Sequence, residues 1–280
     1  MTAVNLTSVL APAVEKNTLV PGLVVLGWED ACAYLEAAEE LAAPIILQAG
    51  PGCRAHTSIP VIGKMLRHLA DQADIPVVCH LDHGYSAEEC LAALDHGFTS
   101  VMFDGSKLPI EENIKITREI AESAHKADVS VEGEVGFVGY AEGAQSASTD
   151  LDEVRRFNDE SLADAIAVSV GNVHLQENSQ SQIDFAQLEQ IEACTSLPLV
   201  IHGGSGVSSV DRLRLARETR VCKINIGTEL RQAFGTSLRS VLQNNPQTYD
   251  RIEILKATMP DLKSAARQVL SQFTEGGREG

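Results

Sequence analysis

Residues 76–103 read PVVCHLDHGYSAEECLAALDHGFTSVMF: a short apolar run, a segment of helical periodicity and a second apolar run. The runs at 76–81 and 100–103 predict strands, and residues 87–96 between them predict a helix. A strand, a helix and another strand in succession are typical of a βαβ unit, in which the two strands are parallel. This stretch therefore indicates an α/β fold.

The same alternation runs along the rest of the chain. Strands are predicted at residues 20–26, 44–48, 76–81, 100–103, 130–135, 163–170, 198–201 and 221–226. Helices are predicted at residues 29–41, 62–71, 87–96, 110–126, 152–157, 185–193, 210–216 and 228–242. Eight such units, without a hairpin signal or a linker, favour a single (β/α)8 TIM barrel over residues 1–280 rather than two doubly wound domains. The longest irregular stretch, residues 136–150, is rich in small residues and is expected to be a mobile active-site loop.

The composition excludes several classes of protein. The 280 residues carry 22 Lys and Arg against 39 Asp and Glu, a net charge of −17, so they lack the clustered cations that nucleic acids and anionic membranes require. The six cysteines form no C-x-x-C pair and lie in apolar stretches, which indicates buried thiols in a reducing compartment. No signal peptide and no apolar run of about 18 residues is visible, so we expect a cytoplasmic protein without a membrane span.

Five of the predicted strands end in polar residues, which lie within the last part of the strand or directly after it. In a (β/α)8 barrel the functional groups gather at the carboxyl ends of the strands, so these residues say most about function. The five strand ends read HLDHG at 80–84, EGE at 132–134, GNVH at 171–174, HGGSG at 202–206 and NIGT at 225–228. We expect their side chains to surround one site.

Three of these strand ends contribute a histidine, namely His83, His174 and His202. Three imidazoles with an open fourth position are an arrangement of catalytic zinc sites, so we predict that they bind one Zn2+ per chain. A single histidine at a strand end is more often only hydrogen-bonded, but three at equivalent positions favour a metal site. His80 lies inside an apolar run and is predicted to be packed or to support a ligand. The other four histidines fall on helices or loops without partners and are given no role.

Two of the strand ends also supply carboxylates. Asp82 directly precedes His83, so it either performs acid–base chemistry beside the ion or orients a ligand, and we favour the first. Glu132 and Glu134 point to the same side of their strand, because side-chain direction repeats every two residues. We expect one of them to face a cation, and we interpret Glu132 as a barrel-interior or solvated carboxylate.

The remaining polar strand ends are rich in glycine. Residues 202–206 join a strand to a helix, and glycines there let backbone N–H groups approach an anion closely. The loops after the seventh and eighth barrel strands often share a phosphate site. Thr228 has the alternative role of a helix N-cap. The residues predicted to bind substrate or phosphate are Gly171, Gly203, Gly204, Ser205, Asn225, Gly227 and Thr228.

Five segments of the chain together resemble a known family. They are HLDHG at 80–84, FTSVMFDGS at 98–106, VEGEVG at 131–136, LVIHGGSG at 199–206 and KINIGTEL at 223–230. In this order they resemble the class II, zinc-dependent ketose-bisphosphate aldolases, which include fructose-bisphosphate and tagatose-bisphosphate aldolases. The resemblance covers nearly the whole chain, and its motifs fall on the predicted strands.

The resemblance implies a reaction, cofactors and partners. The reaction is the reversible cleavage of a ketose 1-phosphate or 1,6-bisphosphate to dihydroxyacetone phosphate and an aldehyde, through a metal-stabilised enediolate. The enzyme is then a carbon–carbon lyase of carbohydrate metabolism that carries one catalytic Zn2+ and a monovalent cation, Na+ or K+, near the phosphate. The resemblance also implies a homodimer or homotetramer.

The resemblance further implies a role for individual residues. The three histidines bind the zinc, and Asp82 handles a proton at the aldehyde oxygen. Glu134 matches a glutamate near a second or alternative metal position. Glu142 matches a loop glutamate that exchanges the proton on the enolising carbon. The residues that match the surroundings of the dihydroxyacetone phosphate half are Gly203, Ser205, Asn225 and Thr228.

Several positions depart from the family pattern. Val24 and Gly50 stand where members commonly carry asparagine and serine, which removes two polar substrate contacts. Leu175 follows His174, where a glycine is usual. Gly227 replaces the aspartate of fructose-specific members and the alanine of tagatose-type members, which argues against strict specificity for fructose bisphosphate.

Two alternative functions stay open at this point. One is a metal-dependent sugar-phosphate isomerase or epimerase, which would use the same enediolate without cleaving a carbon–carbon bond. The other is a non-catalytic, aldolase-like subunit that binds a sugar phosphate, suggested by the altered residues at positions 24, 50 and 175. A three-carbon product distinguishes the aldolase from both alternatives.

Overall fold

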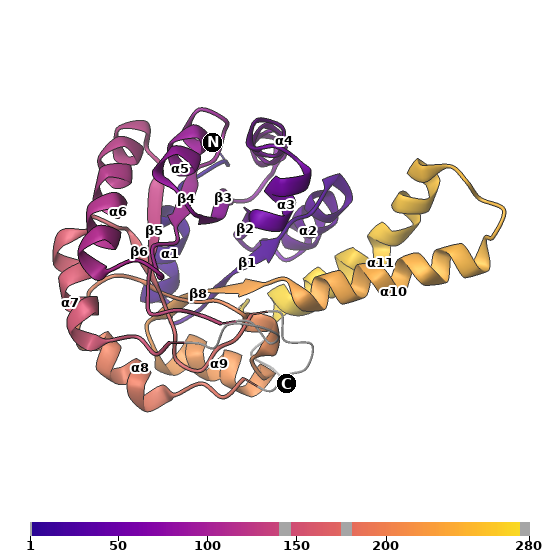
Figure 1. Ribbon diagram of the computed structural model, residues 1–280. Coiled ribbons are helices and arrows are strands. Elements are labelled where there is room, and N and C mark those ends of the chain that lie inside the picture. The colour runs from indigo at the N-terminus through magenta and orange to yellow at the C-terminus, as the bar shows by residue number, and fades with distance from the viewer. Residues whose placement is uncertain (1, 140–146, 175–180, 275–280) are drawn as a thin grey trace.

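The fold is a closed barrel of eight parallel strands that pair in chain order, with β8 returning to β1 (Figure 1). The computed structural model describes residues 2–139, 147–174 and 181–274. The strands are β1 (Val20–Val24), β2 (Ile45–Ala49), β3 (Val77–Gly84), β4 (Ser100–Phe103), β5 (Ser130–Val135), β6 (Ala165–Val168), β7 (Leu199–Ile201) and β8 (Val221–Ile226). All eight predicted strands are present, so the prediction of a (β/α)8 barrel is confirmed.

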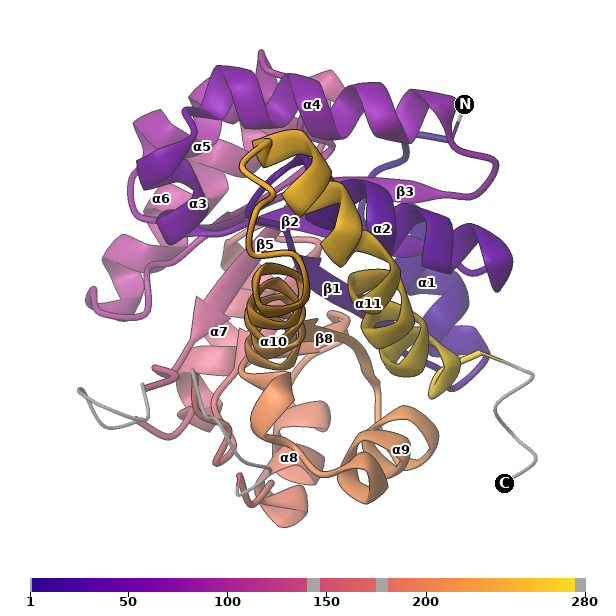
Figure 2. The same ribbon diagram turned by 90° about the vertical axis from the view of Figure 1, so that its right-hand side faces the viewer.

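The eight predicted helices are also present, and all of them surround the barrel except α10, which extends away from it (Figure 1 and Figure 2). They are α2 (Trp28–Glu40), α4 (Ile59–Gln72), α5 (Ala87–Leu94), α6 (Ile110–Ala124), α7 (Leu151–Glu160), α8 (Phe185–Glu192), α9 (Ser209–Glu218) and α10 (Thr228–Asn244). α4 begins before the predicted start, because Pro60 fits the first turn of a helix, where its missing N–H is not needed. α7 begins one residue early because the Asp150 side chain accepts hydrogen bonds from the backbone of Asp152 and Glu153.

Two long helices were not predicted, α1 (Thr7–Glu15) and α11 (Arg251–Ser271). Each contains an internal proline, Pro12 in α1 and Pro260 in α11, and an internal proline argues against a helix in a single sequence. Both helices form because one face of each is buried, so tertiary packing overrides the local preference. The short elements α3 (Pro51–His56), η1 (His125–Ala127) and η2 (Gly204–Gly206) complete the fold.

Apolar side chains fill the amino-terminal part of the barrel interior, and α1 completes this cluster. Leu6 and Leu10 of the α1 region pack with Val20 of β1 and Val78 of β3. A second, larger cluster lies between the outer face of the strands and the helices, and it includes Cys79. Val78 and Cys79 belong to different clusters because successive side chains of a strand point to opposite faces.

Toward the carboxyl ends of the strands the barrel interior becomes polar. Glu132 of β5 and Lys223 of β8 are fully buried, and the Lys223 Nζ lies 2.8 Å from the Glu132 Oε2. His80 of β3 and His202, which follows β7, are fully buried around the same carboxylate. The apolar filling therefore ends below a layer of buried polar side chains.

α10 and α11 pack against each other and extend away from the barrel, and α11 returns along α2 (Figure 1). The pair follows β8, so α10 begins at the same end of the barrel as the polar strand ends. None of the helices in the described part of the chain combines the length and the apolar character that a membrane span needs.

Removing the main α1 contact should destabilise the barrel. Leu10 is 1% exposed in the interior cluster, so Leu10→Ala removes apolar contacts and leaves a cavity. We expect the free energy of unfolding to fall by about 2–5 kcal/mol, measured by urea denaturation followed by circular dichroism. Val210→Ala is the matched control, because Val210 is 75% exposed; it should change this value by less than about 0.5 kcal/mol. Equal effects would show that α1 does not stabilise the barrel.

Candidate active site

A cavity of about 270 Å³ opens at the carboxyl ends of the strands. This is the end of the barrel at which the sequence predicts a site. Eight of the predicted site residues line it: Asp82, His83, His174, Gly203, Ser205, Asn225, Gly227 and Thr228. The wall also contains Gln48 of β2 and Arg231 of α10, neither of which was predicted.

The three predicted metal histidines lie together. The centroid of the His83 ring lies 4.6 Å from that of His202 and 5.1 Å from that of His174, and the other two centroids are 5.7 Å apart. Each ring offers one nitrogen, and these nitrogens all lie within 4.8 Å of one another. Three strand ends that are distant in the sequence thus converge on a single point, as the ligands of one metal ion must.

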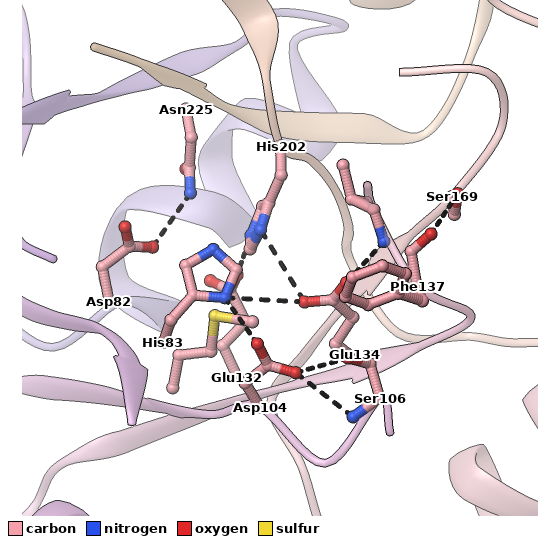
Figure 3. A network of polar contacts seen from close by, with 12 residues as sticks. Asp82, His83, Asp104, Ser106, Glu132, Glu134, Phe137, Ser169, His202 and Asn225 are labelled. Atoms are coloured by element: carbon pink, nitrogen blue, oxygen red, sulfur yellow. Dashed lines mark hydrogen bonds and ion pairs between the residues drawn. The ribbon is translucent and has the colours of Figure 1, made fainter. Parts of the chain in front are cut away.

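A break in the β3–β4 pairing brings Asp82 and His83 to the same cavity. The register of the two strands shifts between Leu81 and Gly84, and His83 within this break has a φ of 51°, in the left-handed region. In a regular strand two successive side chains point to opposite faces. A bulge re-aims the side chains beside it, and here both Asp82 and His83 line the cavity (Figure 3).

Asp104, directly after β4, orients the His83 ring. The His83 Nδ1 lies 2.9 Å from the Asp104 Oδ2, and the same carboxylate accepts a hydrogen bond from the Ser106 hydroxyl (Figure 3). Burial disfavours the charged ring, but the carboxylates of Asp82, Asp104 and Glu134 outweigh it and raise the pKa of His83 to about 9. With Nδ1 bound to Asp104, the Nε2 of His83 is the nitrogen available to a metal.

The buried polar layer of the barrel interior fixes the orientation of the His202 ring through Glu132. The His202 Nε2 lies 3.0 Å from the Glu132 Oε1. Figure 3 shows His202 and Glu132 in this network. Glu132 is paired in turn with Lys223. Burial lowers the pKa of His202 well below its usual value, and burial also lowers the pKa of His174 to about 4. His202 is therefore a neutral ring whose Nδ1, on the opposite edge from Glu132, is available as a ligand.

The donor atoms fit a divalent metal ion. The His202 Nδ1 and the Glu134 Oε2 are buried atoms without a hydrogen-bond partner, and they lie 3.8 Å apart. Buried polar atoms left unsatisfied are costly, and a cation between them would satisfy both. His83, Asp104 and Glu134 form a second group whose ligand atoms also lie within 4.8 Å of one another. Burial raises the pKa of Glu134 to about 8, so a cation would also favour its ionised form.

Two further polar residues lie under this group. The Glu132 carboxylate is fully buried in the barrel, which agrees with its interpretation as a barrel-interior residue. The His80 Nδ1 lies 2.9 Å from the Ser100 hydroxyl, and its Nε2 lies 3.7 Å from Glu132. Burial lowers the pKa of His80 well below its usual value. His80 is thus a packed, neutral histidine below the cavity, as predicted.

On the other side of the cavity, Asn225 donates a hydrogen bond from Nδ2 to the Asp82 Oδ1 at 3.1 Å (Figure 3). The Asn225 Oδ1 and both amide atoms of Gln48 are buried without a hydrogen-bond partner. Because both residues line the cavity, these atoms are available to a bound polar molecule. In the sequence, Gln48 stands at the end of a predicted apolar strand, and only this position marked it as a candidate site residue.

The glycine-rich turn after β7 is tied to the start of α10. Gly203 has a φ of 66°, which glycine adopts without strain. The Ser205 hydroxyl accepts hydrogen bonds from the backbone N–H groups of Gly227 and Glu229, at 3.2 and 3.4 Å. The predicted phosphate residues Gly203, Ser205, Gly227 and Thr228 therefore lie next to one another at the first turn of α10.

Two predicted substrate residues, Gly171 and Gly204, do not line the cavity. A Cβ on Gly171 would lie 2.1 Å from the Gln182 carbonyl oxygen, and a Cβ on Gly204 would lie 2.4 Å from the Ile224 side chain. Both positions require glycine because neighbouring parts of the chain approach closely there. Close packing of the backbone therefore explains why glycine occupies these two positions in the sequence.

Val24 and Gly227, two of the departures from the family pattern, lie near each other in the cavity wall. A Cβ on Gly227 would lie 3.0 Å from the Val24 Cγ2. A larger residue at position 227 therefore requires Val24 to move. This part of the cavity wall is apolar, with Val24 and Leu26 beside the small Gly50 and Gly227.

Three other residues that shape the site were missed, namely Asp104, Lys223 and Arg54. Asp104 and Lys223 are charged residues at the end of, or within, apolar strands, and that position was a usable signal. Arg54 lies in α3, and its sequence context gives no such signal. Glu142 and Leu175 lie outside the described residues, so the role of Glu142 stays a prediction.

Comparison with known proteins agrees with this geometry. The family described as Fructose-bisphosphate aldolase class-II matches residues 4–278. The chain is 35% identical to the 6-phospho-5-dehydro-2-deoxy-D-gluconate aldolase of Bacillus licheniformis, across 99% of this chain and 97% of that protein. It is also 35% identical to the fructose-bisphosphate aldolase of Staphylococcus aureus, across 99% of both chains.

A solved structure shows the same architecture. The YdjI aldolase from Escherichia coli K12 superposes with a TM-score of 0.83 at 29% identity, covering 99% of this chain and 100% of the other. The sequence matches run over nearly the full length of the chain, and the barrel places the family's motifs around one cavity. The chain therefore belongs to the class II fructose-bisphosphate aldolase family and is an aldolase, a carbon–carbon lyase.

Proposed function

We propose that the chain is a zinc-dependent aldolase that reversibly cleaves a phosphorylated ketose to dihydroxyacetone phosphate and an aldehyde. The observation that carries this proposal is the convergence of His83, His174 and His202 beside a cavity whose wall contains Asp82. The family implies a divalent metal. Three imidazole nitrogens that lie close together favour Zn2+ over harder ions, which prefer oxygen ligands.

The residues of the chain would divide the work between them. The three histidines, with Glu134 at a second position, would hold the ion, which when bound supplies a Lewis acid that polarises the substrate carbonyl group. Asp82 would give or take the proton at the aldehyde oxygen, and the hydrogen bond from Asn225 fixes the direction of its carboxylate. By resemblance alone, Glu142 would exchange the proton on the enolising carbon.

The phosphate of the dihydroxyacetone half would bind at the first turn of α10. Gly203, Ser205, Gly227 and Thr228 lie there, and the amino-terminal end of a helix carries partial positive charge. Arg231 lines the same side of the cavity and adds a cation. A monovalent ion, Na+ or K+, is proposed near this phosphate on the family resemblance.

The sugar itself is a matter for experiment. Two relatives at 35% identity carry the names of different substrates, a phosphorylated deoxy-dehydrogluconate and fructose bisphosphate. A Cβ at position 227 would lie 3.0 Å from the Val24 Cγ2, so the aspartate of fructose-specific members would require Val24 to shift, and this supports a substrate other than fructose bisphosphate. A screen of aldehyde acceptors with dihydroxyacetone phosphate would identify the partner. A homodimer or homotetramer in the cytoplasm is proposed by the same resemblance, and the six free thiols suit a reducing compartment.

Removal of the metal should abolish cleavage. Dialysis against a chelator is expected to lower kcat by about 1,000-fold or more, because the Lewis acid contributes several kcal/mol to the transition state. One equivalent of Zn2+ per chain should restore it, measured by coupled detection of dihydroxyacetone phosphate. Full activity in the metal-free protein would contradict the proposed function.

Asp82→Asn should separate proton transfer from metal binding. The Asp82 carboxylate lies beside the metal group without belonging to the three histidines, so zinc content should remain near one per chain. Loss of an acid–base group is expected to lower kcat by about 10²–10⁴-fold. Metal analysis and steady-state kinetics on the same preparation make the comparison. A variant that keeps its full kcat would exclude Asp82 as the acid–base group.

Metal binding should release protons. In the metal-free protein the pKa of His83 is about 9, so its ring is protonated near neutral pH and must lose that proton before it can bind an ion. Because the pKa is raised, the proton competes below about pH 9, and apparent zinc affinity should increase by about tenfold per pH unit up to that point. Calorimetry in buffers of different ionisation enthalpy should detect at least one proton released per Zn2+. Binding without proton release near pH 7 would contradict the raised pKa.

A further inference from the structure

Arg54 of α3 reaches from its helix to the backbone beneath the candidate metal group. Its Nη1 donates hydrogen bonds to the carbonyl oxygens of Ala49 and Asp82, both at 2.6 Å, and its Nη2 donates to the carbonyl oxygen of His83 at 2.8 Å. Its Nε lies 2.8 Å from the Glu89 Oε1. The Arg54 side chain is 4% exposed, so these bonds are shielded from water.

The carbonyl groups that Arg54 binds lie where the barrel pairing fails. The β2–β3 register ends at Ala49 and Leu81, and the β3–β4 register resumes only at Gly84. Asp82 and His83 lie between these points, and His83 has a positive φ, which is unfavourable for a residue with a Cβ. In the described barrel, the pairing of β3 with β2 and β4 therefore does not fix the backbone of Asp82 and His83.

We propose that Arg54 is a positioning residue that holds Asp82 and His83 in the orientation needed for proton transfer and metal binding. This inference rests on the proposed function, which assigns those two roles. Arg54 does not line the cavity, so it would act through the backbone of its two partners and not through the substrate. A planar guanidinium suits this task because its fixed donors can reach several carbonyl oxygens at once, whereas a lysine ammonium is a single point of charge.

Glu89 of α5 completes the arrangement. Its Oε1 pairs with Arg54, and its Oε2 accepts a hydrogen bond from the backbone N–H of Tyr85, directly after β3. The backbone N–H of Glu89 donates in turn to the Ser86 hydroxyl, the N-cap of α5. One ion pair thus connects the end of β2, the bulge of β3 and the start of α5.

The test compares Arg54→Lys and Arg54→Ala with Arg118→Ala. Arg118 of α6 is the control because it likewise forms one ion pair with a glutamate, and it makes a single hydrogen bond to a backbone carbonyl on the exposed surface, away from the cavity. The probe is Co2+ titrated into the metal-free full-length protein, read by its visible absorption spectrum. Urea denaturation of each variant gives its stability, and a coupled assay of the zinc-loaded form gives kcat and KM.

Both Arg54 variants are expected to bind Co2+ about 10–100-fold more weakly than the wild type, with an altered spectrum, because the orientation of His83 has changed. kcat should fall by about 10²-fold with KM little changed, because Asp82 is displaced from the reacting atoms. Methylguanidine added to Arg54→Ala should restore part of both losses. Arg118→Ala should match the wild type in every readout.

A second variant keeps the test decisive if Arg54→Ala does not fold. Glu89→Gln retains the three carbonyl bonds of Arg54, but it removes the ion pair and one of the two hydrogen bonds that the Glu89 carboxylate accepts from Arg54 and Tyr85, so it should show the same changes at smaller size. Arg54 variants that lose stability but keep the Co2+ affinity, the spectrum and kcat of the wild type would overturn the positioning role. A wild-type chain that binds no Co2+ would instead overturn the proposed function, so the two failures are distinguishable.

Discussion

Closure of the parallel barrel is the constraint on which the rest of this structure depends. In a closed parallel sheet every strand ends at the same rim, so residues far apart in the sequence must meet there. His83 lies at the end of the third strand, His174 follows the sixth and His202 follows the seventh, yet their ring centroids are only 4.6 to 5.7 Å apart. The same closure sets the first turn of α10 close to them, so three imidazoles and the amino-terminal end of a helix lie at one end of the barrel.

The polar layer beneath the histidines shows how the barrel orients its ligands. Glu132 and Lys223 form a fully buried ion pair, and such a pair is weak evidence for stability because both charges lose their hydration. The pair has a clearer role in orientation, since Glu132 also fixes the Nε2 of His202 and leaves Nδ1 without a hydrogen-bond partner, 3.8 Å from the Glu134 carboxylate. Asp104 acts in the same way on His83, from the opposite nitrogen. Both rings are thus directed by carboxylates that stand behind them.

The sequence by itself determined the strands, the barrel and most of the site. Alternating apolar runs and helical segments are local patterns, so eight strands and their helices could be predicted from single segments. The rule that function gathers at strand ends then selected His83, His174, His202 and Asp82 without coordinates. Gly171 was selected by the same rule, but it does not line the cavity and its position requires glycine for close packing, a steric demand that the sequence alone does not distinguish from a binding role.

Only the tertiary structure decided the features that depend on contacts between distant segments. α1 and α11 contain internal prolines, and burial of one face outweighs that local penalty. The bulge at His83 and its contact with Arg54 join residues from separate βα units, and no local pattern encodes such a contact. Which nitrogen of His202 stays without a hydrogen-bond partner is likewise decided by Glu132, on a different strand. Periodicity reports which face of an element is buried, whereas hydrogen bonds across the barrel depend on a register that exists only once all eight strands have closed.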